Sequence, residues 1–213
     1  MPEPSQVSPD PVPPTQAPPN PALEEQAALA AAGPPPGVLP AGATLPDAPL
    51  LNPYGTPVRL HDALGSRLTV VLFYRGAWCP HCNRALRRYQ AELVPELLRR
   101  AIPLVAISPQ TPDGSLTMQE KNELTFTVLS DPGNVLARQV GILTRPSDAV
   151  RARQLAFGID ITASNADGTT ELPMPTTLIV DGEHVIRWID VHPNYATRSE
   201  PAEILAALDS LDF

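Results

Sequence analysis

The sequence predicts an α/β fold in which helices flank a mixed central sheet, with a proline-rich tail in front of it. Two patterns carry this prediction. Strand-like and helix-like segments alternate from about Thr44 onward, which is typical of a sheet covered by helices. Prolines crowd the front, where 15 of the 28 fall before residue 50. With 43% hydrophobic residues in a chain of 213, the remainder can bury one substantial core.

The front of the chain is expected to have no core of its own. Residues 1–43 are predicted to be a disordered, partly polyproline tail, because this composition buries too little apolar surface to offset the ordering entropy. One short helix is expected inside it, since Asn20 supplies a cap, Pro21 suits the first helical position and Gly33 ends the alanine-rich run. One domain is expected over residues 44–213.

The first elements of this domain surround the chain's two cysteines. Residues 68–74 are a nearly continuous apolar, β-branched run, the mark of a strand buried on both faces. After the cysteines, apolar residues recur every three or four positions and predict an amphipathic helix over residues 80–100. These residues are Leu86, Tyr89, Leu93 and Leu97. Pro95 lies inside the pattern and is expected to kink the helix.

The remaining elements continue the alternation. Further strands are expected at residues 102–108, 126–129, 176–180 and 184–191. Further helices are expected at residues 115–124, 134–140 and 200–211. Ser199 is expected to cap the last helix, with Pro201 at its first position. The polar segment 143–172 is predicted to be a loop-rich insertion that borders a site.

Charge and composition exclude several classes of partner. The net charge of −8 and the pI near 4.9 oppose binding to phosphate backbones and acidic membranes, so no nucleic acid or membrane partner is expected. We find no signal-peptide pattern and no apolar run long enough to span a membrane. Two cysteines do not make the disulfide framework of a small secreted protein, so a cytoplasmic location is expected.

The two cysteines, Cys79 and Cys82, lie where the buried strand gives way to the amphipathic helix. Backbone N–H groups and the helix dipole stabilise a thiolate at such a junction. Residues three apart in a first helical turn lie about 5 to 6 Å apart, which matches the Cα separation of a disulfide. Pro80 needs no amide donor there and stiffens the loop. The pair is therefore predicted to be a dithiol–disulfide couple.

Two other interpretations of the cysteines were weighed. A structural zinc site needs four ligands, and the histidines outside the motif stand alone in the sequence, so no metal is expected. The second interpretation is a pair of inert core thiols, which would not need to lie at a helix N-terminus. His81, between the cysteines, is predicted to tune the couple electrostatically, with a solvated spacer as the alternative. No glycine-rich phosphate cradle is present, so no nucleotide or flavin cofactor is implied.

Several short motifs resemble the peroxiredoxin family (alkyl hydroperoxide reductase / thiol-specific antioxidant) of the thioredoxin-fold superfamily, and its CxxC-bearing branch in particular. They are Leu45-Pro46-Asp47-Ala48, residues 70–74, Val105-Ala106-Ile107-Ser108, Leu129-Ser130-Asp131 and residues 177–182. The resemblance covers nearly everything after residue 44. It implies a thioredoxin-like fold, a peroxide substrate, thioredoxin or another dithiol as reductant, and a homodimer as the common assembly.

The chain departs from the peroxiredoxin motif Pro-x-x-x-Thr-x-x-Cys. Laid on this sequence, the motif places its peroxidatic cysteine at Cys82, its Thr at Cys79 and its Pro at Arg75. The family's catalytic Arg falls on Pro175. The resemblance thus leaves two activating residues of the motif and the catalytic Arg replaced, and Arg75 or Arg84 is the candidate for a substitute charge.

The same stretch also resembles thioredoxin. Trp78 precedes the CxxC as in that family, and Met174-Pro175-Thr176 is similar to its cis-proline segment, which implies a cis bond before Pro175. In thioredoxin-like chemistry Cys79 would attack and Cys82 would resolve. In peroxiredoxin-like chemistry Cys82 would become a sulfenic acid and Cys79 would condense with it.

The predicted function is that of a redox enzyme whose Cys79–Cys82 couple reduces hydrogen peroxide or organic hydroperoxides. Two alternatives stay open: a thioredoxin-like reductase of protein disulfides, and a non-enzymatic redox sensor or adaptor. Other residues outside the motif are expected to have structural and not catalytic roles. Trp188 is expected in the core, Asp190 as a solvent-facing acid, and Tyr195 with His192 in a turn.

Overall fold

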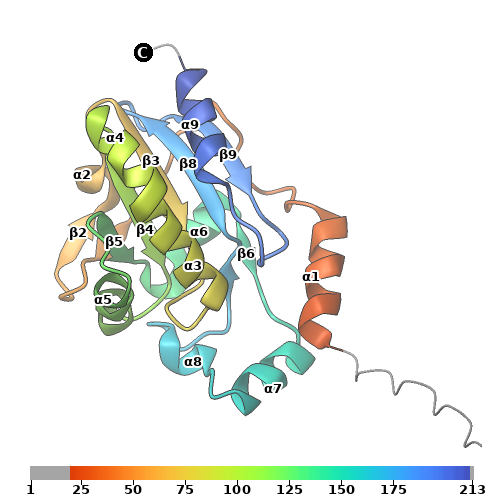
Figure 1. Cartoon of the computed structure of the whole chain (residues 1–213). Coiled ribbons are helices and arrows are strands. Elements are labelled where there is room, and N and C mark those ends of the chain that lie inside the picture. The colour runs from red at the N-terminus through yellow and green to blue at the C-terminus, as the bar shows by residue number, and fades with distance from the viewer. Residues whose placement is uncertain (1–19, 212–213) are drawn as a thin grey trace, which may run out of the picture.

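A computed structural model of the chain describes residues 20–211. Their main feature is a seven-stranded mixed sheet with the strand order β2-β1-β5-β4-β3-β8-β9 (Figure 1). The strands of this sheet are β1 (Pro49–Leu51), β2 (Pro57–Arg59), β3 (Leu68–Phe73), β4 (Leu104–Ser108), β5 (Thr127–Ser130), β8 (Thr176–Asp181) and β9 (Ile186–Val191). The α/β class with a mixed sheet is confirmed, and β3, β4, β5, β8 and β9 lie within about two residues of the five predicted strands, whereas β1 and β2 were not predicted.

Strand β3 is the centre of the sheet. It pairs in parallel with β4 and antiparallel with β8, and all six of its residues are buried. Because side chains alternate across a strand, Val70 and Leu72 enter one core cluster while Val71 and Phe73 enter the other. The strand therefore has no solvated face, which explains its unbroken apolar sequence.

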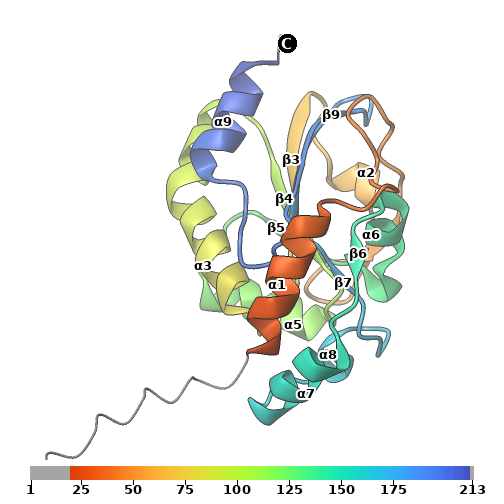
Figure 2. The ribbon, with the colours of Figure 1, turned by 90° about the vertical axis from the view of Figure 1, so that its right-hand side faces the viewer.

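Helices cover both faces of the sheet (Figures 1 and 2). The helices are α1 (Pro21–Ala32), α2 (Leu60–Ala63), α3 (Pro80–Arg88), α4 (Val94–Arg99), α5 (Pro112–Lys121), α6 (Val135–Val140), α7 (Asp148–Ala156), α8 (Ile161–Ser164) and α9 (Pro201–Asp209). A 3₁₀ turn at Pro132–Asn134 precedes α6. Helices α3, α4, α5 and α9 pack on one face, and α2 and α6 pack on the other.

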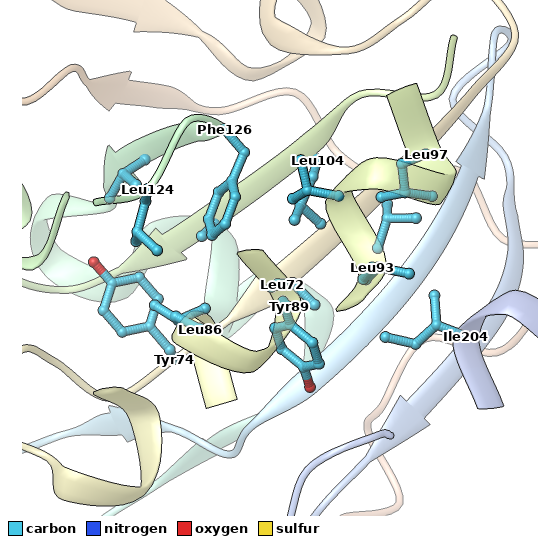
Figure 3. Close-up of a cluster of buried hydrophobic side chains, with 14 of the residues drawn as sticks. Leu72, Tyr74, Leu86, Tyr89, Leu93, Leu97, Leu104, Leu124, Phe126 and Ile204 are labelled. Carbon is cyan, nitrogen blue, oxygen red and sulfur yellow. The ribbon is translucent and has the colours of Figure 1, made fainter. Parts of the chain in front are cut away.

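The predicted amphipathic helix after the cysteines is confirmed, with one irregularity. A π-helical turn, Tyr89–Leu93, separates α3 from α4, and Pro95 follows at the start of α4. Pro95 has no N–H to donate to the preceding turn, which accounts for the break. The apolar side chains of this helix meet Leu72, Phe126 and Ile204 in the core on that face (Figure 3).

The segment from residue 20 to residue 43 is bound to the domain, whereas the sequence led us to expect a disordered tail. Helix α1 forms as predicted, with the Asn20 side chain as cap and Gly33 at its end. The Tyr195 hydroxyl donates to the Ala22 carbonyl at 3.1 Å. After the helix, the Gly42 N–H donates to the Ile186 carbonyl at 2.8 Å. The remainder of the expected tail, residues 1–19, lies outside the described residues.

The predicted loop-rich insertion is more regular than its polar sequence indicated. It contains α7, α8 and a small two-stranded sheet formed by β6 (Leu143–Thr144) and β7 (Leu172–Pro173). Ser147 caps α7 and Asp160 caps α8 through their side chains. These helices are too short and too polar to show an apolar period. Their capping residues are the only local sign of them in the sequence. Helix α7 contacts α1 (Figure 2).

The last helix begins one residue later than its expected cap. Glu200, not Ser199, is the N-cap, and it forms a capping box with Glu203. Ser199 is withdrawn into the core, where its hydroxyl bonds other side chains. Of the helices between residues 20 and 211, none is long and apolar enough to cross a membrane.

We predict a large stability difference between two neighbouring leucines of α4. Leu97 is 1% exposed and packs in the core, whereas Leu98 is 72% exposed. Leu97→Ala should lower the free energy of unfolding by about 2–5 kcal/mol through lost contacts and a cavity. Leu98→Ala, with the same loss of atoms, should change it by no more than about 0.5 kcal/mol. Urea unfolding measures both, and equal effects would contradict the packing described here.

Candidate functional site

Cys79 and Cys82 lie at the start of α3, directly after the loop that follows β3. Cys79 is the N-cap residue, and Cys82 lies in the first helical turn, with Pro80 at the first helical position as predicted. Both thiols are free, and the residues are 1% and 0% exposed, respectively. The strand-to-helix junction expected from the sequence is therefore present, with both sulfurs covered by neighbouring segments.

The loop between β3 and α3 is held in place by side chains from two other elements. The Asn83 amide donates to the carbonyls of Ala77 and Cys79 at 2.7 and 2.9 Å. The Gln110 side chain accepts from the Ala77 N–H at 2.6 Å. Gly76 has a φ of +149°, and a Cβ at this position would lie 2.5 Å from Trp78 Nε1. The loop thus needs a glycine where the indole crosses it.

Cys82 is surrounded by hydrogen-bond donors. Arg198 Nη2 lies 3.0 Å from Cys82 Sγ, and the Arg75 backbone N–H lies 3.4 Å from it. Burial alone would raise the pKa of Cys82, but the hydrogen bond from Cys79, the charge of Arg198 and the Arg75 N–H together lower it well below its usual value. Cys82 is thus the thiol of the pair that ionises more readily.

Cys79 has the opposite character. Its hydrogen bond to Cys82 and its burial raise the pKa of the Cys79 thiol far above the ordinary range, against smaller opposing effects of Arg75 and Arg198. Cys79 therefore keeps its proton and directs it toward the Cys82 sulfur. The arrangement divides the couple into one anionic and one protonated sulfur.

Arg198 is the residue that sequence reasoning missed. It lies in the segment between β9 and α9, where its guanidinium donates to the Tyr195 carbonyl at 2.8 Å and to the Thr197 carbonyl. These bonds fix its position beside Cys82, and no local pattern in the sequence reveals it. Arg84, a sequence candidate for this charge, is exposed and forms no hydrogen bond or ion pair within residues 20–211.

Arg75, the second candidate, donates its backbone N–H to Cys82 Sγ, whereas its side chain lies against two aromatic rings. Its guanidinium carbon lies 4.0 Å from the centre of the Tyr195 ring and 5.2 Å from that of Trp78. Burial lowers the pKa of Arg75, while the two cysteines raise it. Trp78 packs against the core cluster that contains both cysteines. Tyr195 lies in the expected turn and is buried against this guanidinium.

A polar network supports the segment that carries Arg198. Asp190 accepts from Ser199 Oγ at 2.7 Å and lies 2.8 Å from His192 Nε2. The bond from His192, opposed by burial and aided by Ser199, lowers the pKa of Asp190. Thr197 Oγ1 lies 2.7 Å from the other nitrogen of His192. Asp190, expected to face solvent, is instead half-buried in this network, whereas Trp188 packs against the core as expected.

His81 and Pro175 also lie at the site. His81 is half-buried, and burial, followed by the charges of Arg198 and Arg84, lowers its pKa, so the imidazole is neutral near pH 7. Pro175 lies beside Cys82 across a small cavity. The expected cis bond before Pro175 is wrong, because every peptide bond in the described chain is trans.

Two cavities of different size reach the two sulfurs. The cavity at Cys82 has a volume of about 10 Å³, enough for roughly one water molecule. Its polar walls come from Thr177, His192, Arg198 and Ser199. A second cavity, of about 200 Å³, opens beside Cys79. No group of three or more metal-ligating side chains gathers within the part of the chain that the structure covers.

Comparison with known proteins gives consistent results. The sequence profile of the AhpC/TSA family matches residues 41–189. A bcp protein of Haemophilus influenzae, named as a peroxiredoxin, is 35% identical over 96 residues, which are 44% of this chain and 59% of that protein. Its counterpart in Buchnera aphidicola is 33% identical over 86 residues, 40% of this chain and 52% of that protein. The matched part thus spans little more than half the length of these curated relatives.

Solved structures share the fold. Peroxidoxin BcpB from Mycobacterium tuberculosis superposes with a TM-score of 0.61 at 20% identity, over 81% of this chain and 98% of that one. Reduced Prx3 in complex with hydrogen peroxide, from Vibrio vulnificus, superposes with a TM-score of 0.65 at 18% identity, over 80% of this chain and 99% of that one. These likenesses confirm the thioredoxin-like fold expected from the sequence.

The opposite pKa shifts of the two thiols predict a split titration. Ultraviolet absorbance should show one thiolate near neutral pH and no second thiolate until strongly alkaline pH. The neutral signal should vanish in Cys82→Ser and persist in Cys79→Ser, whose hydroxyl still donates to Cys82. A neutral thiolate that disappears with Cys79→Ser instead would reverse the assignment.

Proposed function

Because the chain belongs to the AhpC/TSA family of peroxiredoxins, we propose that it is a thiol peroxidase in which Cys82 attacks the peroxide and Cys79 resolves the product. One observation carries the assignment: Arg198 and the Arg75 N–H both donate to the buried Cys82 sulfur, whose pKa they help to lower. A nucleophilic sulfur needs the thiolate form, and Cys82 has it at neutral pH.

The first step is attack of the Cys82 thiolate on one peroxide oxygen. A sulfur–oxygen bond forms, the oxygen–oxygen bond breaks, and the second oxygen leaves with the electron pair of that bond and takes up a proton. Cys82 becomes a sulfenic acid. Negative charge moves from sulfur to the leaving oxygen in this step. A cation beside the sulfur stabilises that charge throughout, which is the part we assign to Arg198.

The second step closes the couple. The Cys79 sulfur attacks the Cys82 sulfenic acid, an S–S bond forms, and the hydroxyl leaves as water with the proton of Cys79. The two thiols are already hydrogen-bonded to each other, so little motion is needed. A thiol reductant then returns the disulfide to the reduced form.

Arg198 accounts for the departure of this chain from the peroxiredoxin motif. The family's Arg position is occupied by Pro175, and its motif Thr by Cys79. We propose that the Cys79 thiol takes the hydrogen-bonding part of that Thr, and that Arg198 supplies the missing cation from another segment. The charge is thus restored by a residue more than a hundred positions from the motif.

The size of the Cys82 cavity favours the smallest peroxide. A space of about 10 Å³ holds roughly one water molecule, so hydrogen peroxide needs the least opening of the cavity walls and a bulky alkyl group the most. A related fold, Prx3 of Vibrio vulnificus, was solved with hydrogen peroxide bound. We therefore propose hydrogen peroxide ahead of organic hydroperoxides as the substrate.

The disulfide-reductase alternative needs Cys79 as an accessible nucleophile. Cys79 is 1% exposed, and its pKa is raised rather than lowered, so both features oppose that chemistry. A sensor role would begin with the same oxidation of the Cys79–Cys82 couple. It would therefore accompany the peroxidase activity and not replace it. Two cysteines do not make the disulfide framework of a small secreted protein, so the cytoplasm is our proposed location.

Peroxide kinetics of the two cysteine variants test the assignment. With hydrogen peroxide in stopped flow, oxidation should persist in Cys79→Ser and be abolished in Cys82→Ser. The rate constant should stay level as pH falls from neutral, and decline only as pH passes below the lowered pKa of Cys82, because protonation removes the nucleophile. Oxidation that survives Cys82→Ser would disprove the proposal.

The role of Arg198 is tested by removing its charge. Arg198→Met should lower the peroxide rate constant by about 100-fold and move the fall in rate to higher pH, since the pKa of Cys82 rises when the cation is lost. Arg138→Met is the matched control, because Arg138 pairs with Glu171 on the surface. An unchanged rate and pH profile in Arg198→Met would show that Arg198 only fills space.

A further inference from the structure

The larger cavity, beside Cys79, is separate from the peroxide cavity and is named here the Arg75 pocket. It has a volume of about 200 Å³. Its apolar walls come from the CxxC helix, α1, and the segments that include and flank α7. They are Ala22, Trp78, Pro80, Val150, Phe157, Ile159 and Tyr195. Cys79 lines this pocket and Cys82 does not, whereas Cys82 lines the peroxide cavity and Cys79 does not.

Two buried donors in this pocket have nothing to bind within the described chain. Arg75 is 3% exposed, and its Nε and Nη2 atoms are buried without a hydrogen-bond partner among residues 20–211. Trp78 Nε1 is likewise unsatisfied in the same part of the chain. Leaving a buried charged donor unpaired costs more than the net worth of an ordinary hydrogen bond. The two aromatic rings beside the guanidinium offset part of that cost and leave its N–H groups free.

The charge of the pocket selects an anion. Arg75 and Arg153 are its cationic side chains, and none of the lining residues in the described chain is acidic. A carboxylate matches a guanidinium better than a point acceptor does, since both oxygens can pair with the N–H fork. The occupant is therefore a small carboxylate with an apolar body.

The position of Cys79 beside the pocket indicates that the occupant reacts with the disulfide. In the oxidised couple, an incoming thiolate can attack either sulfur and expel the other. The thiol with the lower pKa is the better leaving group, so attack on Cys79 with departure of Cys82 is favoured. Cys79 is also the sulfur that the Arg75 pocket reaches. The order of leaving groups and the position of the pocket thus both favour attack on the Cys79 sulfur.

We propose that the Arg75 pocket binds a low-molecular-weight thiol bearing a carboxylate and presents its sulfur to Cys79 of the Cys79–Cys82 disulfide. The proposal rests on the proposed function only in taking that disulfide as its substrate. The carboxylate pairs with Arg75 and Trp78 Nε1, and the apolar body lies against Phe157 and Tyr195.

The reduction balances with two thiols. The first thiolate forms an S–S bond with Cys79, and the Cys79–Cys82 bond breaks to release the Cys82 thiolate. A second thiolate attacks the bound thiol's sulfur, forming a free disulfide and releasing Cys79, which takes up a proton. Two electrons pass from the two small thiols to the protein.

A small thiol fits this site better than a protein dithiol. Cys79 is 1% exposed, and α1 and the segment with α7 stand beside it at one side of the molecule (Figures 1 and 2). The loop of another protein cannot reach a sulfur so covered unless these helices move, whereas a molecule of a few heavy atoms enters the pocket as it stands.

The test compares two thiols that differ in one group. The disulfide is formed with diamide, so that the outcome does not depend on peroxidase activity, and is then reduced with 3-mercaptopropionate or with its amide. Rates are compared per thiolate. The acid should be faster by roughly tenfold, as expected for one charge-assisted interaction. Arg75→Met should abolish this preference, and Arg138→Met should retain it.

A second variant covers the case in which Arg75→Met fails to fold. Phe157 is 70% exposed at the pocket rim, so Phe157→Asp should leave the fold intact and repel the carboxylate. It should slow the acid thiol several-fold more than the amide, because both lose the contact with the phenyl ring and only the acid meets the new negative charge. Equal rates for acid and amide in the unaltered protein, or a preference that survives Phe157→Asp, would overturn the proposal. So would fast reduction by a protein dithiol with slow reduction by both small thiols.

Discussion

The site depends on keeping one thiolate, that of Cys82, inside the protein. A buried anion is costly unless donors surround it, and here the donors come from three places: the Cys79 thiol, the Arg75 N–H and the Arg198 guanidinium. The first two belong to the turn between β3 and α3. The third comes from the far end of the chain. The lowered pKa of Cys82 therefore depends in part on the docking of the last segment against the first helix after the motif.

That docking is itself maintained by buried polar contacts. Ser199 joins the Thr177 hydroxyl of β8 to the Asp190 carboxylate of β9, at 2.9 and 2.7 Å. The Tyr89 hydroxyl donates to the Ser199 carbonyl at 2.7 Å and so connects the helix behind the cysteines to the same point. These bonds hold the carbonyls that orient Arg198. A polar network under the sheet edge thus sets the electrostatics of a sulfur on another element.

The N-terminal helix and the insertion give the two cysteines different surroundings. On one side, Cys82 faces a cavity the size of a single small molecule. On the other, α1 and α7 contribute to a larger apolar wall beside Cys79, where Nε and Nη2 of Arg75 have no hydrogen-bond partner among residues 20–211. Oxidant and reductant then have separate approaches to one couple, which keeps the two half-reactions from competing for the same space.

The sequence by itself determined the α/β class, the central strand, the helix after the motif and the junction that holds the cysteines. These features follow from local patterns: an unbroken apolar run, a period of three to four, and a proline at a helix start. It also indicated α1 through Asn20 and Gly33. The helices of the insertion were not predicted, because α7 and α8 are short and polar and a capping residue alone is a weak signal of a helix.

Only the tertiary structure decided which residues complete the site. Arg198 lies beside Cys82 because the chain, after the edge strand β9, returns to the face of the sheet that α3 and α9 share. No local pattern encodes a contact across 116 positions. The same holds for Asp190 and Ser199, whose roles depend on partners from other strands. The sequence identified the couple, but the difference between its sulfurs is an electrostatic property of groups that meet only in the folded chain.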